Sequence, residues 1–144
     1  MNIYFSCSIT GGRQDQEAYS TIVSYLIDGG HIVPTAHLSS PDVLDLEKVA
    51  SAEEIYARDV QWVRECDALI AEVSTPSHGV GYEIALANFY NKPVLCCYRK
   101  DRKVSKMILG NPSPLQQGCT YQYPGELKKV VSSFLDALQN GRKA

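Results

Sequence analysis

The sequence predicts an α/β fold in which helices cover both faces of a mostly parallel β-sheet. Three features of its 144 residues lead to this prediction. Short apolar runs alternate with longer amphipathic stretches, the run at 68–73 is almost entirely apolar, and Gly or Pro stands at many of the boundaries. Such alternation is typical of βαβ units, and a strand without polar alternation suits a sheet buried on both faces.

The first half of the chain contains two predicted strands and two predicted helices. Residues 2–8 (NIYFSCS) form the first strand, which a turn at Gly11 and Gly12 ends. Apolar residues recur at helical spacing over 14–30, so we expect a helix that ends at a pair of glycines. Residues 31–35 (HIVPT) are the predicted second strand, and the polar segment 39–50 is a predicted loop with at most a helical turn. Ser51 followed by Glu54 matches a capping box, which predicts a helix over 51–67.

The second half continues the same alternation. Residues 68–73 (ALIAEV) are the third predicted strand, 80–91 a helix and 92–98 the fourth strand. A helical turn at 105–109, a fifth strand at 119–123 and a closing helix over 126–139 complete the chain. Five strands in this length suggest a single flavodoxin-like (Rossmann-like) domain over 1–144, with strand order 2-1-3-4-5.

This topology locates a binding site. In open parallel sheets, ligands bind beyond the carboxyl ends of the strands that flank the switch in strand order, here the first and third. The loops after these strands read SITGGR and STPSHGVG. Both are rich in Ser, Thr and Gly, which allow close backbone approach and hydroxyl donation to phosphate.

Composition excludes several classes of function. A formal charge of −2 with scattered basic residues argues against a nucleic-acid surface. No apolar run reaches the ~18 residues that span a membrane, and the N-terminus lacks a signal-peptide pattern, so we expect a cytoplasmic protein, or a nuclear one in a eukaryote. Five cysteines without CxxC spacing predict neither a disulfide framework nor a zinc site. We expect no metal and no cofactor.

Two carboxylates are the candidate catalytic groups. Glu83 follows the second loop closely, where Ser77 and Gly79 lead into a helix whose free N–H groups favour an anion. Asp59 lies near the apolar face of its helix, where a charge needs a partner or a task. From the residues alone, Glu83 could simply favour the helix dipole, and Asp59 could form an ion pair with Arg58 or Arg64. The second loop matches neither a Walker motif nor a dinucleotide fingerprint.

Several segments together resemble the 2'-deoxynucleoside 5'-phosphate N-hydrolases of the nucleoside 2-deoxyribosyltransferase superfamily. They are IYFSCSITGGR, AHL, EEIYARDVQWVRECDALIAEVSTPSHGVGYEIALA, NKPVLC and VSKMI, in the family's order and over most of the chain. The block from Asp59 to Glu83 is the most specific of them. The resemblance implies a small-molecule nucleotide substrate and a flavodoxin-like homodimer in which each subunit completes the other's site.

The resemblance also implies roles for individual residues. Glu83 aligns with the nucleophile that attacks the anomeric carbon, Asp59 with the second catalytic carboxylate, and Tyr4 with a tyrosine beside the sugar. His37 falls in the base pocket, although a lone histidine or a strand tyrosine would otherwise be read as structural. The other expected substrate-binding residues lie in the first loop (Cys7, Ser8, Ile9, Thr10, Gly11), in the second (Ser77, Gly79), and in the segment that reaches the neighbouring subunit's site (Ser105, Met107).

The first loop departs from the family pattern. Related hydrolases often read Gly-Ser-Ile-Arg where this chain has Cys7-Ser8-Ile9-Thr10. The missing arginine bears on phosphate binding, and Arg13 is near enough in sequence to replace it. Cys7 in place of glycine narrows the expected sugar or base pocket.

The expected reaction is hydrolysis of the N-glycosidic bond of 2'-deoxynucleoside 5'-monophosphates, through a glycosyl–Glu83 intermediate, to a free base and 2-deoxyribose 5-phosphate. The helix start is expected to keep Glu83 ionised. Three alternatives stay open: a nucleoside 2-deoxyribosyltransferase, a CMP-type ribonucleotide N-glycosidase, and a non-catalytic nucleotide sensor.

Overall fold

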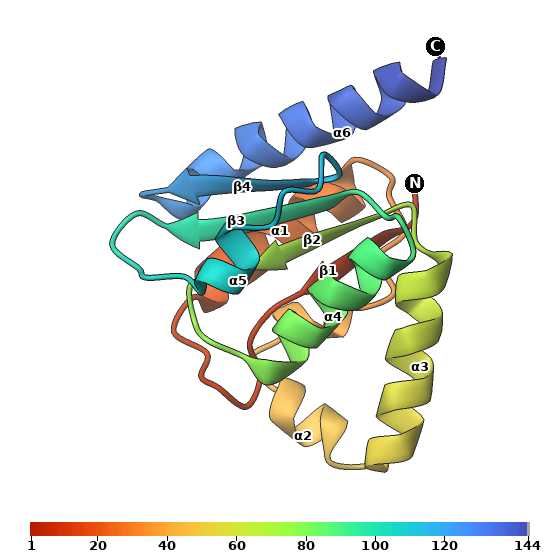
Figure 1. Cartoon of the computed structure of the whole chain (residues 1–144). Helices are drawn as coiled ribbons and strands as arrows, with labels where there is room; N and C mark the ends of the chain where they lie inside the picture. The colour runs from red at the N-terminus through yellow and green to blue at the C-terminus, as the bar shows by residue number, and fades with distance from the viewer. Residues whose placement is uncertain (144) are drawn as a thin grey trace.

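The computed structural model describes residues 1–143 and centres on a four-stranded sheet (Figure 1). Its strands are β1 (Ile3–Ser6), β2 (Ala68–Glu72), β3 (Val94–Arg99) and β4 (Gln116–Tyr121). They run parallel in the order β1-β2-β3-β4, with Ile3 opposite Ala68 and Leu69 opposite Val94. The predicted parallel α/β architecture is therefore confirmed, and β1 and β2 are neighbours as expected.

The prediction of five strands is wrong, because the expected second strand does not form. Residues 31–35 make one isolated parallel bridge, between Ile32 and Asn2, and then turn away. Pro34 explains this outcome, since it lacks an N–H for the ladder and restricts the residue before it. The flavodoxin-like order 2-1-3-4-5 is thus reduced to its last four members.

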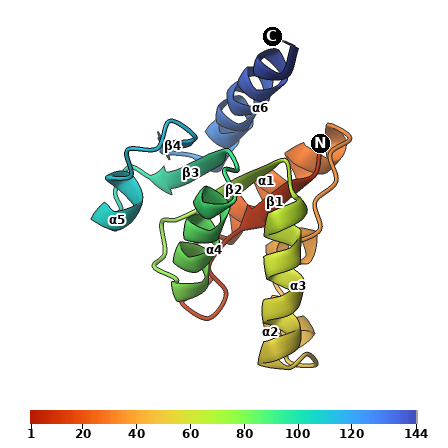
Figure 2. The ribbon, with the colours of Figure 1, turned by 45° about the vertical axis from the view of Figure 1, so that its right-hand side comes forward.

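Helices cover both faces of the sheet (Figures 1 and 2). Helices α1 (Gln16–Asp28) and α6 (Leu127–Lys143) pack on one face, and α3 (Ala52–Glu65) and α4 (His78–Phe89) on the other. Alternation along β1 divides the core accordingly, because Ile3 and Phe5 join the first cluster and Tyr4 joins the second. Tyr4 therefore points towards α3 and α4.

The remaining elements are short. They are the 3-10 helix η1 (Ala36–Ser39), α2 (Val43–Glu47), α5 (Lys106–Leu109) and the 3-10 helix η2 (Pro124–Glu126). In Figure 2, α4 lies between α3 and α5. Among residues 1–143, no helix has both the length and the apolar character needed to cross a membrane.

Local signals account for most element boundaries. The capping box is present: Ser51 accepts from the Glu54 N–H at 3.2 Å, and Glu54 accepts from the Ser51 N–H at 2.7 Å. The fifth predicted strand, expected at 119–123, corresponds to β4 but starts three residues earlier, at Gln116. Its first residues are polar and carry little strand signal, whereas pairing runs along β3 from Val94 to Arg99.

Candidate functional site

The loops that follow β1 and β2 meet at the carboxyl edge of the sheet, as the topology predicts. A Cβ on Gly11 would lie 2.3 Å from the Pro76 carbonyl oxygen, so the contact between the loops requires a glycine there. The Ser8 side chain is fully buried, and its hydroxyl has no hydrogen-bond partner among the described residues. A Cβ on Gly11 would also lie 2.9 Å from the Ser8 hydroxyl oxygen, which places Ser8 at the junction of the two loops.

Glu83 is held on the inner side of α4 by two hydroxyls from β1. Tyr4 donates to Glu83 Oε1 at 2.8 Å, and Ser6 donates to Glu83 Oε2. Tyr4 and Ser6 are two residues apart on one strand and so face the same side of the sheet. Both carboxylate oxygens are therefore fixed, and Glu83 also lines the adjoining cavity.

The electrostatic setting of Glu83 differs from the expectation. Helix α4 starts at His78 with Ser77 as its N-cap, which places Glu83 in the second turn, where the effect of the helix dipole has faded. The pKa of Glu83 is raised to about 7, chiefly by burial and to a smaller extent by nearby Asp59, while the hydrogen bonds from Ser6 and Tyr4 and the charge of Arg58 oppose the rise. The hydroxyls, rather than the helix start, favour the ionised form.

Asp59 shares a cavity of about 420 Å³ with Glu83. Asp59 comes from α3 and forms an ion pair with Arg58 at 2.9 Å, with a fifth of its side chain exposed. The two carboxylates thus line one space from two helices. The cavity also takes in the first loop, the N-terminus of α4 and the segment before α3. Among the residues whose side chains are described, its lining is Cys7, Ile9, Thr10, Leu38, Leu44, Lys48, Ile55, Asp59, Ser77, Gly79, Val80 and Glu83.

Aromatic and cationic groups flank this cavity on the side of η1. The guanidinium of Arg58 lies 4.8 Å from the centre of the Trp62 ring. The His37 ring packs edge-on against the Trp62 ring, and the two ring centres are 6.3 Å apart. His37 does not itself line the cavity, but the next residue, Leu38, does.

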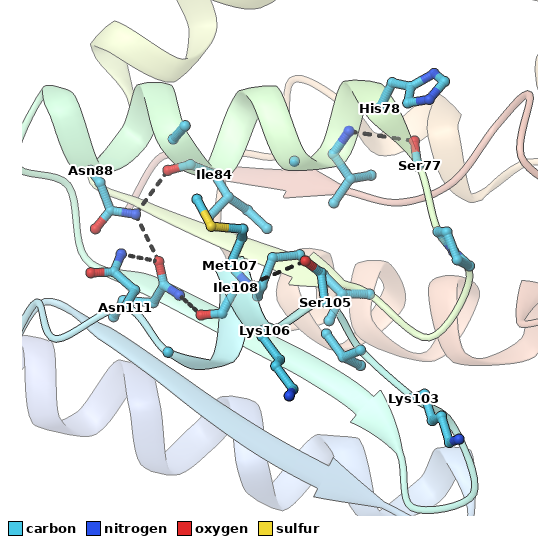
Figure 3. A pocket seen from close by; sticks show the side chains of 18 of the residues that line it. Ser77, His78, Ile84, Asn88, Lys103, Ser105, Lys106, Met107, Ile108 and Asn111 are labelled. Atoms are coloured by element: carbon cyan, nitrogen blue, oxygen red, sulfur yellow. Dashed lines mark hydrogen bonds between the residues drawn. The ribbon is translucent and has the colours of Figure 1, made fainter.

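Ser105 and Met107 lie outside the Glu83 cavity. They line an adjoining cavity of about 900 Å³ between α4 and α5. Figure 3 shows Ser77 and Asn88 on the α4 side of this space and Ser105 and Met107 on the α5 side. Ser77 lines both cavities, so the two spaces adjoin at the N-terminus of α4. Met107 is 87% exposed, which leaves its side chain accessible to another molecule.

Arg13 does not take the place of the missing arginine. Thr10, at the family's arginine position, lines the cavity, whereas Arg13 does not. The Arg13 guanidinium donates instead to backbone carbonyls, including that of Leu38 at 2.7 Å. The structure thus contradicts the suggestion that Arg13 supplies a charge to the phosphate site.

Sequence reasoning missed Ser6 and Glu72. The position of Ser6 two residues after Tyr4 could have indicated that it faces the same carboxylate. Glu72 is the last residue of β2 and is fully buried in an otherwise apolar strand. It accepts hydrogen bonds from the Ser74 side chain and from the Tyr121 hydroxyl at 3.0 Å. Burial raises the pKa of Glu72 to about 7, with a smaller contribution from Asp15.

Replacing Glu72 by Gln should stabilise the protein above neutral pH. The folded state favours the protonated carboxyl, so its contribution to the free energy of unfolding is present below the ordinary glutamate pKa of 4.5 and is lost as the pH rises through about 7. A neutral amide avoids this loss. We therefore expect the free energy of unfolding of Glu72→Gln to be about 2 kcal/mol higher than that of the wild type at pH 8. Urea titrations at pH 5 and pH 8 measure the difference. A gain that is the same at both pH values would contradict the proposed cause.

Among the described residues, no group of three His, Cys, Asp or Glu side chains is placed to hold a metal ion. The described lining carries the carboxylates of Asp59 and Glu83, the ammonium group of Lys48, and the hydroxyl groups of Thr10 and Ser77. Such an arrangement suits covalent or acid–base chemistry at a sugar carbon.

Comparisons with known proteins agree with this chemistry. The profile of the family described as nucleoside 2-deoxyribosyltransferase matches residues 3–131. A Methanosarcina barkeri (strain Fusaro / DSM 804) protein assigned by name to the 2'-deoxynucleoside 5'-phosphate N-hydrolases is 43% identical over 94% of this chain and 86% of its own length. A Danio rerio protein named 5-hydroxymethyl-dUMP N-hydrolase is 39% identical over 96% of this chain and 98% of its own.

A solved structure extends the comparison to the fold. The Clostridium botulinum CMP N-glycosidase superposes with a TM-score of 0.67 over 90% of this chain and 98% of its own. At 17% sequence identity, this likeness concerns the arrangement of the sheet and helices alone.

Proposed function

Because the chain belongs to the nucleoside 2-deoxyribosyltransferase family, we propose that it hydrolyses the N-glycosidic bond of 2'-deoxynucleoside 5'-monophosphates. The products are a free nucleobase and 2-deoxyribose 5-phosphate. The observation that carries this proposal is the carboxylate of Glu83, fixed by Tyr4 and Ser6 beside a cavity that it shares with Asp59. Relatives named as hydrolases of deoxynucleotides support the choice of water as the acceptor.

The phosphate would bind at the start of α4. Ser77 and Gly79 line the cavity there, and the first N–H groups of this twelve-residue helix favour an anion. The Ser8 hydroxyl has no partner in the described chain, but it is fully buried and does not line the cavity, so it would become a further donor only after the first loop shifts. Ile9, Thr10 and Cys7 would contact the sugar and phosphate from the first loop, and Gly11 lets that loop approach the second.

The reaction would proceed in two displacements. An ionised Glu83 oxygen bonds to C1' as the C1'–N bond breaks. The electron pair of the broken bond passes to the base, which takes a proton that the partly exposed Asp59 has acquired from solvent. Water then attacks C1' of the glycosyl–Glu83 ester and gives a proton to Asp59. The bond between C1' and Glu83 breaks, and Glu83 leaves as a carboxylate. Tyr4 stays neutral because burial and Glu83 raise its pKa far above its usual range, so it remains a donor throughout.

The neighbouring subunit would complete each site. Met107 is 87% exposed and Phe89 76%, and Tyr56 and Tyr82 stack edge-on at the surface of α3 and α4. Large exposed apolar groups of this kind mark interaction surfaces. A homodimer would cover them and bring Ser105 and Met107 to the partner's cavity. Analytical ultracentrifugation at micromolar concentration tests this, and a monomer would contradict it.

A panel of nucleotides tests the proposed activity. We expect base release from dCMP, dGMP, dUMP and 5-hydroxymethyl-dUMP, and at least about tenfold lower kcat/KM for CMP and GMP. A 2'-hydroxyl withdraws electrons from C1' and so disfavours the positive charge that develops there. Chromatography of the released bases measures the rates. Equal rates on ribonucleotides and deoxyribonucleotides would favour the alternative function, a CMP-type ribonucleotide N-glycosidase.

Base exchange separates hydrolysis from transfer. A transferase would pass the sugar to an added free base, whereas the hydrolase yields 2-deoxyribose 5-phosphate at the same rate with or without that base. If the protein bound nucleotide without releasing base, a non-catalytic nucleotide sensor would replace both the hydrolase and the transferase hypotheses.

A further inference from the structure

Arg13 connects two walls of the Glu83 cavity that are distant in sequence. Its guanidinium donates to the Ser8 carbonyl at 3.1 Å, in the first loop, and to the carbonyls of Leu38 and Ser40, each at 2.7 Å, at the end of η1. It also donates to the Cys7 sulfur at 3.5 Å. Cys7 and Leu38 both line the cavity, so the contact spans from one wall to the other.

Neighbouring side chains hold Arg13 in this position. The Tyr19 ring of α1 lies beneath the guanidinium, 5.0 Å from its central carbon. Gln16, at the start of α1, accepts a hydrogen bond from Arg13 and donates one to the Ser39 carbonyl. The carbonyls of three successive residues, 38 to 40, are therefore bound by side chains from residues 13 and 16.

The segment that Arg13 holds has little regular structure of its own. η1 is a four-residue 3-10 helix, and such helices have weak internal hydrogen bonds. This segment carries His37, whose ring packs against Trp62, and Leu38, which lines the cavity. Because Leu38 lines the cavity, a shift of this segment relative to the first loop would change the shape of that wall.

We infer that Arg13 is a positioning residue for the nucleobase, acting by fixing the segment 37–40 against the first loop. This role rests on the proposed function, since it assumes that a nucleotide occupies the Glu83 cavity. An arginine suits the task, because its planar group donates in several fixed directions and stacks on an aromatic ring. Lysine keeps the charge but cannot reach the carbonyls of both walls together.

The test compares two ligands in the Glu83→Gln background, where bound nucleotide is not consumed. With Arg13→Lys added, we expect dCMP and dGMP to bind at least about tenfold more weakly by calorimetry, whereas 2-deoxyribose 5-phosphate, which lacks the base, changes less than about threefold. Arg102→Lys is the matched control, because the Arg102 guanidinium donates to the Gln14 side chain at 3.2 Å and Arg102 does not line the Glu83 cavity. This variant should leave the binding of both ligands unchanged.

Equal weakening of both ligands, or no change in either, would overturn the role of Arg13. Should Arg13→Lys fail to fold, Gln16→Ala removes the bond to the Ser39 carbonyl and decides the question, with about threefold weaker nucleotide binding expected and sugar phosphate binding unchanged. Base release by the wild-type protein tests the proposed function separately.

Discussion

Replacing Glu83 by Gln should lower kcat for dCMP at least about a thousandfold and leave the Kd of dCMP within about threefold. Glutamine keeps the size of the side chain and can still accept a hydrogen bond from Tyr4. It cannot form the bond to C1' or stabilise the positive charge that develops on the sugar. Rapid-quench measurement of base release and calorimetry of the variant provide the two numbers.

Glu72→Gln is the matched control, because Glu72 is also a buried glutamate whose pKa is raised to about 7. It does not line the Glu83 cavity, and its variant should keep kcat within about threefold of the wild type. The wild-type kcat/KM should also fall as the pH drops below about 7, since protonation of Glu83 removes the nucleophile. A Glu83→Gln variant that retained more than about a tenth of the activity would contradict the assignment.

Replacing Asp59 by Asn should lower kcat by about a hundredfold to a thousandfold, because the leaving base then departs without a proton. The loss should be smaller for dUMP than for dCMP, since uracil is a more acidic base than cytosine and leaves more readily without a proton. Comparison of kcat for the two nucleotides distinguishes proton donation from a structural role. If Asp59 has only a structural role, kcat should fall by the same factor for both nucleotides. Arg58→Gln, which removes the ion-pair partner of Asp59 at 2.9 Å, should then cause the same fall.

Much of the fold could be predicted because local signals and tertiary structure agree. The capping box at Ser51 and the apolar run of β2 each identify one element without reference to the rest of the chain. The segment around Ile32 has strand-like residues, yet Pro34 removes a ladder donor and the strand shrinks to a single bridge. The polar start of β4 forms because β3 offers a partner, which no local pattern reveals.

The candidate site was predicted less completely, because its contacts join residues that are far apart in sequence. Tyr4 and Glu83 come together through the pairing of β1 with β2 and the packing of α4. The sequence indicated both residues through resemblance, but not the hydroxyl of Ser6 or the turn of α4 that Glu83 occupies. Arg13 is near enough in sequence to replace the missing arginine, and only its bonds to the carbonyls of residues 38 and 40 show where its guanidinium is directed.

The central claim is that the carboxylate of Glu83 faces the anomeric carbon of a bound deoxynucleotide. A crystal structure of the Glu83→Gln variant with dCMP tests it most directly. We expect the side-chain oxygen of residue 83 within about 3.5 Å of C1' and the phosphate at Ser77 and Gly79. A nucleotide whose C1' lies beyond about 6 Å from residue 83, or whose phosphate binds away from the start of α4, would contradict the account.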